Sequence, residues 1–492
     1  MPELSQPGPG LPSGTAASPR HSGDVLIIVC AGVVLASLDL FIVNVALPDI
    51  ARDLGNRSLG DLSWVLNGYA IVYAALLVVM GRLADRHRRK YGFLLGVAVF
   101  TAASGACGAA TSVPMLIAFR LVQAAGAALL TPTSLSLVLA SYPPERRGGA
   151  VRTWTATGGM AAALGPVIGG LLVTASWRWV FLVNVPIGLA ALVAGWLWLP
   201  DAPGHAVPRP DALGAALVTA GIGTLTLGLV EGGDWGWGSV RTVLVLAAAV
   251  VLLALFALHC ARSGNPLVEP ALFRARTFTG ATVVMLLFSM AFGAMLLSIV
   301  LWAQDDWGWS ALRTGLAVAP GPVMVPVFSF LVAGRLITRF GPAVVVAAGS
   351  AVLSAGIIWW ALAIGLRPDY PGGMLGGMLL TGVGVGLTLP TLMATAAGSL
   401  PPASFATGSA VVNMIRQVGM AVGVAILVAV LGSPDTSVAR LAAFQHGWWV
   451  IAATALAGAA GAVLLHRPAQ VPARPNPSPE PGPTVSPGSI RN

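Results

Sequence analysis

The stretch LASLDLFIVNVALP, from Leu35 to Pro48, decides how the rest of the chain is interpreted. It contains Asp39, within an apolar run that begins at Val25 and carries no other charge. A charged side chain at the centre of a membrane-spanning helix costs about 2.5 to 3.5 kcal/mol on insertion scales, so such a residue usually has a function. The alternative is an Asp at the membrane surface on a misplaced span. The run disfavours it, because apolar residues continue to Leu47 with only Asn44 polar.

Composition places the whole chain in a membrane. Of 492 residues, 56% are hydrophobic and only 9% are charged. Fourteen apolar runs have about the 20 residues needed to cross a bilayer, the first over 24–48 and the fifth over 150–175. We therefore expect an all-α integral membrane protein with fourteen transmembrane helices.

The basic charges indicate the orientation of these helices. The chain has 27 Lys and Arg and a net charge of +9. Two of these residues, Arg120 and Arg416, fall inside spans and seven fall in odd-numbered connections, whereas the remaining 18 lie in the tails and even-numbered connections. By the positive-inside rule both termini are cytoplasmic. The charge is thus a topology signal, and no nucleic-acid partner is expected.

Two similar sequence motifs predict a duplicated unit of helices. GRLADRHRRK (Gly81–Lys90) follows the second span and GRLITRF (Gly334–Phe340) follows the tenth. The spans that precede these motifs cross the membrane in the same direction, which fits a parallel repeat of six helices. The predicted organisation is a disordered cytoplasmic tail at 1–23, a six-helix bundle at 24–199, two inserted transmembrane helices at 211–260, a second six-helix bundle at 278–465 and a disordered cytoplasmic tail at 468–492.

Among the acids, only Asp39 lies deep in a span, and it faces two intramembrane cations. Counted along the helices, Asp39 and Arg120 lie at similar depths, close enough for the Arg side chain to bridge them. Burial favours the neutral carboxyl and a guanidinium favours the ionised one, so moving Arg120 relative to Asp39 would capture or release a proton. A static ion pair that fixes helix packing is the alternative. Arg416 has no acid at its depth and is expected to face a wet cavity.

Several motifs, taken in order, resemble the fourteen-helix drug:proton antiporters of the major facilitator superfamily, over residues 24–465. Some positions depart from that pattern, such as Phe41, Arg88 and Ala124. The matching segments are Leu38-Asp39 with Asn44 to Pro48, Gly81 to Arg86 with Arg89 and Lys90, Arg120 with Gln123 and Gly126, Gly165-Pro166 with Gly169-Gly170, Trp177 to Pro186, Gln304 to Gly315, and Asn413 with Arg416, Gln417 and Gly419.

The resemblance implies a major facilitator fold, with two six-helix bundles plus two inserted helices, and roles for the motif residues. Asp39 would accept the coupling proton, and Arg120 would face the cavity. A conformational latch is expected at Gly81, Asp85, Arg86 and Arg89, and a gate at Gly165, Pro166, Gly169 and Gly170. The substrate-cavity candidates are Asn44, Asn67, Gln123, Asn413, Arg416 and Gln417, although each of the amides could instead satisfy a neighbouring helix.

These observations predict a proton-driven exporter of hydrophobic or amphiphilic drugs or antibiotics, working by alternating-access antiport. Two intramembrane cations against one acid favour neutral, acidic or zwitterionic substrates. No phosphate-binding loop, metal cluster or hydrolytic triad is recognised, so we expect neither an enzyme nor a cofactor, and a proton gradient as the energy source. The rivals are a proton-coupled importer of a small metabolite and a non-transporting receptor or scaffold. We expect a monomer surrounded by lipid in a bacterial cytoplasmic membrane.

Overall fold

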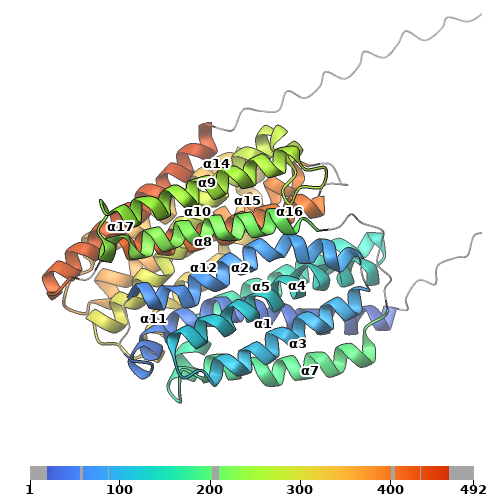
Figure 1. The fold of residues 1–492 in the computed structure, drawn as a ribbon, viewed down its shortest axis with the longest axis horizontal. Helices are drawn as coiled ribbons and strands as arrows, with labels where there is room; N and C mark the ends of the chain where they lie inside the picture. The colour runs from blue at the N-terminus through green and yellow to red at the C-terminus, as the bar shows by residue number, and fades with distance from the viewer. Residues whose placement is uncertain are drawn as a thin grey trace, which may run out of the picture.

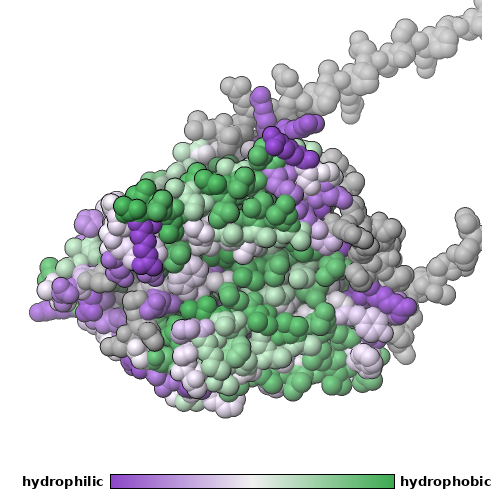
Figure 2. Space-filling model, viewed as in Figure 1, coloured by the Kyte–Doolittle hydropathy of each residue, from purple (hydrophilic) through white to green (hydrophobic). Residues whose placement is uncertain are grey.

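The computed structural model describes residues 19–55, 59–86, 88–201, 210–400, 405–432 and 434–464, and all regular secondary structure within these ranges is helical. In this part of the chain, thirteen helices are long and apolar enough to cross a membrane. The predicted fifth span falls in α5 (Pro144–Val173). Within α5, the stretch Leu164–Val173 is apolar but shorter than a full membrane span. Figure 2 shows a broad apolar band between surfaces with more polar side chains, as expected of a multi-pass membrane protein.

The helices of the N-terminal half pack against one another in the lower part of Figure 1. Helix α4 packs against α2 and α3, and α1 packs against α4, α5 and α7. Ser112 begins α4 by accepting a hydrogen bond from the amide of Met115, a common way to start a helix. Besides α5, these helices are α1 (Pro19–Asp53), α2 (Leu59–Arg86), α3 (Arg89–Gly108), α4 (Val113–Ser141), α6 (Trp179–Leu182) and α7 (Asn184–Trp198).

The C-terminal half packs in the same way, with α10 against α16 and α17, and α14 against α15 and α17. Its predicted tenth span is divided into short helices joined by a π-helical segment, because Pro320 and Pro326 interrupt regular backbone bonding. The elements are η1 (Pro270–Arg274), α10 (Arg276–Leu301), η2 (Trp302–Asp306), α11 (Ala311–Val318), α12 (Pro320–Val327), η3 (Phe328–Ala333), α13 (Gly334–Phe340), α14 (Pro342–Ala363), η4 (Tyr370–Leu375), α15 (Gly376–Gly398), α16 (Phe405–Leu431) and α17 (Ser437–Leu464).

The two helices between these halves are α8 (Ala212–Trp235) and α9 (Val240–Arg262). Helix α8 packs against both α2 and α16, so it covers one seam between the halves, and α9 packs on α8. Asp211 fixes the start of α8: it accepts hydrogen bonds from the amides of Gly214 and Leu267 at 2.8 and 2.7 Å and lies 2.9 Å from His259 Nε2. Partial burial raises the pKa of the Asp211 carboxyl, but these hydrogen bonds outweigh it and leave the pKa below its usual value.

Helix α1 is longer than predicted at both ends. It begins at Pro19, inside the predicted 1–23 tail, and it continues through Pro48 to Asp53. Residues 1–18 and the predicted tail at 468–492 lie outside the described residues. The additional C-terminal turns of α1 are stabilised because Trp177 Nε1 and Arg178 Nη1 donate to Asp53 Oδ2 at 2.8 and 2.6 Å. Asp39 is therefore about 21 Å from the end of its helix, at 1.5 Å per residue, rather than the roughly 13 Å of the predicted span.

Candidate functional site

Asp39 on α1 and Arg120 on α4 form an ion pair inside the N-terminal half. Both side chains are fully buried, and Arg120 Nη1 donates to Asp39 Oδ2. Gln123, one helical turn after Arg120, donates from Nε2 to the other carboxylate oxygen at 2.8 Å and accepts from Arg120 Nη1 at 2.8 Å. The two charges predicted to be close are thus in contact, and both oxygens of Asp39 have donors.

Three further polar or aromatic residues complete this network. Asn184, at the start of α7, donates from Nδ2 to Asp39 Oδ1 at 3.3 Å and to Ser104 Oγ at 3.1 Å. Ser104 on α3 also accepts from Gln123 Nε2 at 3.1 Å. The guanidinium carbon of Arg120 lies 4.1 Å from the centre of the Tyr69 ring. The Asp39 network therefore joins α1, α2, α3, α4 and α7.

The need to stabilise two buried charges explains why polar and aromatic side chains surround Asp39 and Arg120. Two charges without water need close contact and further hydrogen bonds to offset the loss of hydration, and removing one partner of such a pair typically costs about 3 to 5 kcal/mol. Arg120 Nε donates to the backbone carbonyl of Val65 at 3.2 Å, and the Tyr69 ring stabilises the cation through its π face. The donors from Arg120, Gln123 and Asn184 all favour the ionised carboxylate. A change in these contacts would alter the proton affinity of Asp39.

Sequence reasoning missed part of this network. Gln123, predicted to line the cavity, is fully buried and bonded within the ion-pair network, and its spacing of three residues from Arg120 already places both on one helix face. The sequence points to Asn184 only as part of the motif segment Trp177–Pro186. Ser104 and Tyr69 carry no signal, because an uncharged polar or aromatic residue in an apolar run is common.

A second polar group lies where α16 faces α2. Arg416 is partly exposed, its Nε has no hydrogen-bond partner among the described residues, and it interacts electrostatically with Tyr73 of α2. The Tyr73 hydroxyl lies 3.0 Å from Thr131 Oγ1. No acid among the described residues forms a salt bridge with Arg416. Of Arg120 and Arg416, the two cations inside predicted spans, Arg416 is the one without an acidic partner among the described residues.

Three of the four remaining predicted cavity amides bond within their own helices. Asn44 Nδ2 donates to the carbonyl of Leu40 at 3.3 Å, and Asn413 Nδ2 donates to the carbonyl of Ser409 at 3.0 Å. Asn67 donates to a side chain of its own helix, Ser63 Oγ, at 3.4 Å. Gln417 is buried and its Oε1 has no partner among the described residues. A role of these amides in substrate binding stays a prediction.

The predicted gate residues of α5 lie in two close helix contacts. A methyl group at Gly165 would lie 2.8 Å from Phe41 Cβ, and one at Gly169 would lie 2.9 Å from the Ile42 carbonyl oxygen, so both glycines let α1 approach. A methyl group at Gly170 would lie 2.6 Å from the carbonyl oxygen of Ala311, in the C-terminal half. Helix α5 continues through Pro166.

We name the contact between α5 and α11 the outer seam, defined by Pro166 and Gly170 on α5 and by Ala311 and Gly315 on α11. At Gly315 an added methyl group would lie 2.3 Å from the Pro166 carbonyl oxygen. Beside this seam, Gln304 Nε2 donates to the carbonyl of Val45 at 2.9 Å, again between the two halves. All these positions lie toward the membrane side predicted to be outside.

The predicted latch is only partly described. Gly81 lies on α2, where a methyl group would be 3.6 Å from Pro132 Cβ. The side chains of Asp85 and Arg86 lie outside the described part of the structure. Arg89 begins α3, and its Nε has no hydrogen-bond partner among the described residues. Arg82 of the same motif donates to the carbonyl of Pro266 at 2.8 Å, so this end of α2 holds the segment after α9.

Comparisons with known proteins agree on one family. The family model described as Major Facilitator Superfamily matches residues 29–424 and, in a second match, 283–491. The tetracenomycin C resistance and export protein of Streptomyces glaucescens is 35% identical over 428 residues, covering 86% of this chain and 78% of that protein. The cephamycin export protein of Amycolatopsis lactamdurans is 35% identical over 428 residues, covering 86% and 87%. The methylenomycin A resistance protein of Bacillus subtilis is 36% identical over 406 residues, covering 82% and 86%.

Solved structures show the same architecture at low identity. The POT family transporter PepTSo is 16% identical, with a TM-score of 0.65, over 91% of this chain and 98% of that chain. A bacterial homologue of the human lysosomal transporter Spinster is 16% identical, with a TM-score of 0.61, over 91% and 96%. At these identities the likeness concerns the fold alone.

Proposed function

This chain belongs to the major facilitator superfamily, and from that premise we propose that it exports a small hydrophobic or amphiphilic compound in exchange for protons. The family and its relatives point to a transporter rather than an enzyme, in a multi-pass membrane protein. Export is favoured over import because several relatives are described as export or resistance proteins. The proposed membrane is the bacterial cytoplasmic membrane, with both termini in the cytoplasm.

The proposal of proton coupling rests on the buried ion pair of Asp39 and Arg120. A pair that served packing alone could be replaced by apolar side chains at little cost, whereas a carboxylate with its own counter-ion can exchange a proton when the two separate. The cycle we propose has three steps. In the outward-open form, separation of the pair lets Asp39 take up a proton as substrate leaves. The halves then rearrange, and in the inward-open form re-formation of the pair releases the proton inside as new substrate binds.

The arrangement of the halves supports an inward-facing state. The outer seam and the Gln304 hydrogen bond bring the two halves into contact toward the predicted outer side. On the same helix α5, about two to three turns toward the predicted cytoplasmic side, Gly159 has no atom within 4 Å of where its side chain would lie, and Met160 is 60% exposed. We infer that the substrate enters from this inner side and that the outer seam must open to release it.

Arg416 supports a preference for substrates with an acidic or neutral polar group. A cation without an acidic partner would bind a carboxylate or phenolate of the substrate and would repel a dication. The relevant flux assay compares a lipophilic dication with acidic and neutral amphiphiles in proteoliposomes. Good transport of the dication alone would disprove this preference.

Proteoliposomes with an imposed pH gradient test the coupling. We expect Asp39→Asn to abolish gradient-driven accumulation while downhill exchange of the substrate continues, because the carrier can still rearrange without a titratable group. Asp24→Asn is the matched control, since Asp24 is an exposed acid on the same helix. Gradient-driven accumulation that persists in Asp39→Asn would refute the assignment.

A further inference from the structure

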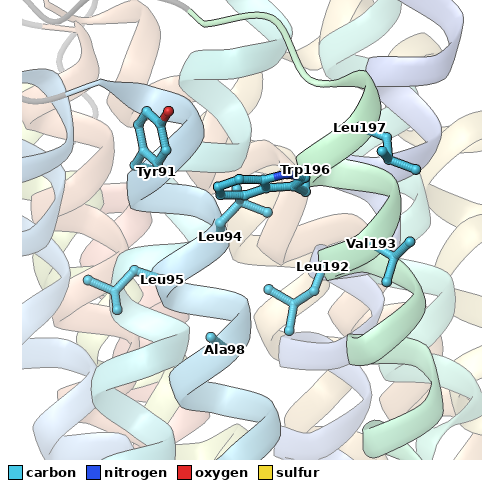
Figure 3. A pocket seen from close by; sticks show the side chains of 8 residues that line it. All are labelled: Tyr91, Leu94, Leu95, Ala98, Leu192, Val193, Trp196 and Leu197. Carbon is cyan, nitrogen blue, oxygen red and sulfur yellow. The ribbon is translucent and has the colours of Figure 1, made fainter.

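A groove lies on the exposed, lipid-facing surface of the N-terminal half, between α3 and α7 and away from the Asp39 network. Its volume is about 680 Å³, and its lining is apolar, with leucines 94, 95, 192 and 197 among its walls. Figure 3 shows the Trp196 indole lying across the space between the two helices, with Tyr91 beside it. The rings of Tyr91 and Trp196 meet edge to face at 6.4 Å. From Tyr91 to Ala98 the groove runs about 10 Å along α3.

Basic side chains lie at the end of the groove marked by Tyr91 and Trp196. Lys90, the single lysine of the chain, donates from Nζ to the backbone carbonyl of Trp196 at 2.7 Å. This bond uses one of the three ammonium donors of Lys90. Arg88 is 61% exposed and pairs with Asp201 at 2.5 Å. Two cations against one acid leave this end of the groove positive.

We propose that this groove binds an anionic phospholipid of the inner leaflet, with an acyl chain between α3 and α7 and the phosphate at Lys90. In the proposed orientation this end faces the cytoplasm, where lipid headgroups are the abundant anions at the membrane surface. The aromatic pair lies where the headgroup region meets the hydrocarbon, a position that Trp and Tyr favour. The first amides of α3 have no side-chain cap, so their partial positive charge adds to that of Lys90.

The positive charge at the Tyr91 and Trp196 end of the groove distinguishes this site from general lipid contact. Any membrane helix touches acyl chains, and the chain alone gains little by moving from bilayer to groove because both are apolar. Selectivity must therefore come from the headgroup. Near an anionic surface each Lys or Arg contributes about 1 kcal/mol, so occupation by an anionic rather than a zwitterionic lipid should change about fivefold per basic residue.

The single lysine allows a direct test on the full-length chain. A second, reference lysine is introduced by Arg339→Lys, since Arg339 is exposed and lies at the corresponding end of the second sequence repeat. The protein is placed in vesicles of phosphatidylcholine, alone or with phosphatidylglycerol, and treated with an amine-reactive reagent. Mass spectrometry then gives the rate of modification at position 90 relative to position 339. This ratio cancels the effect of surface charge on both amines.

We expect phosphatidylglycerol to lower the modification ratio about fivefold, and we expect Ala98→Phe, which fills the groove without changing charge, to remove this protection. A ratio that does not respond to phosphatidylglycerol would overturn the proposal, as would undiminished protection in Ala98→Phe. Protection that is present in pure phosphatidylcholine and is lost on dilution of the protein would assign the groove to a second copy instead. Transport is not the readout, so failure here leaves the proposed function untouched.

Discussion

The outer seam makes a sharp prediction for Gly170→Ala. The added methyl group would lie 2.6 Å from the Ala311 carbonyl oxygen and 2.9 Å from Leu312 Cα, both backbone atoms that cannot rotate away. Such overpacking costs about 1 to 3 kcal/mol. Because the clashing backbone belongs to the other half of the protein, the penalty falls only on the arrangement in which the outer ends touch. The equilibrium should therefore shift toward an outward-open form by about 5- to 150-fold.

Distances between spin labels on the two halves measure this shift. Suitable sites are Ala175, after α5, and Arg367, before η4, because both are exposed in loops on the predicted outer side. Free cysteines at positions 30, 107 and 260 are first replaced. We expect the distribution of distances to move to longer values in Gly170→Ala.

Gly159→Ala is the matched control for this experiment. It places the same methyl group on the same helix, where no atom lies within 4 Å. Since Ala is the better helix former, the control also reports any effect of helix propensity alone. If Gly170→Ala and Gly159→Ala gave the same distance distribution, the outer seam would not be a closed state of a moving contact.

Three further predictions concern the charged groups. Asp39→Asn should lower the free energy of unfolding by about 3 to 5 kcal/mol because Arg120 is left buried and unpaired, and adding Arg120→Gln should recover part of this loss. Thermal unfolding of the single and double variants measures this, and additive effects would contradict a coupled pair. Arg416→Gln should raise KM about tenfold or more for an acidic substrate but not for a neutral one, measured as initial transport rates, and an equal change for both would argue against a charge contact. Asp211→Asn keeps a side chain that caps α8 but removes the negative charge at the helix N-terminus and beside His259, so it should cost about 1 kcal/mol of stability at neutral pH. Because the folded pKa of Asp211 is lowered, its contribution is present above the unfolded pKa of about 3.9 and is lost as the pH falls, so thermal unfolding of the two proteins should converge below about pH 4.

The charges inside the membrane were predictable because each one is conspicuous. Asp39 and Arg120 interrupt long apolar runs, and opposite charges at comparable depth have a strong reason to meet. The span boundaries were less predictable, since α1 extends through Pro48 to Asp53 for a reason that lies far away in sequence. That reason is the pair of hydrogen bonds from Trp177 and Arg178. Hydropathy identifies spans but does not record such contacts.

The uncharged part of the network was out of reach for a physical reason. Ser104 and Asn184 are 80 residues apart and meet only because α3 and α7 are neighbours in the fold. A single sequence does not specify which helices are neighbours. It also does not give helix rotation precisely enough to tell whether a polar residue such as Gln123 faces a cavity or packs between helices. The groove beside Lys90 depends on the same helix pairing.

Helix α1 connects the ion pair to the outer seam. Asp39 contacts α4 on one side of this helix, while Phe41 and Ile42, two and three residues later, pack against Gly165 and Gly169 of α5. Glycines at these positions leave no side chain to absorb a rotation or shift of α1, because the backbones are in direct contact. Any movement of α1 that separates Asp39 from Arg120 must therefore displace α5, and the next residue of α5, Gly170, is the one in contact with Ala311 of the other half.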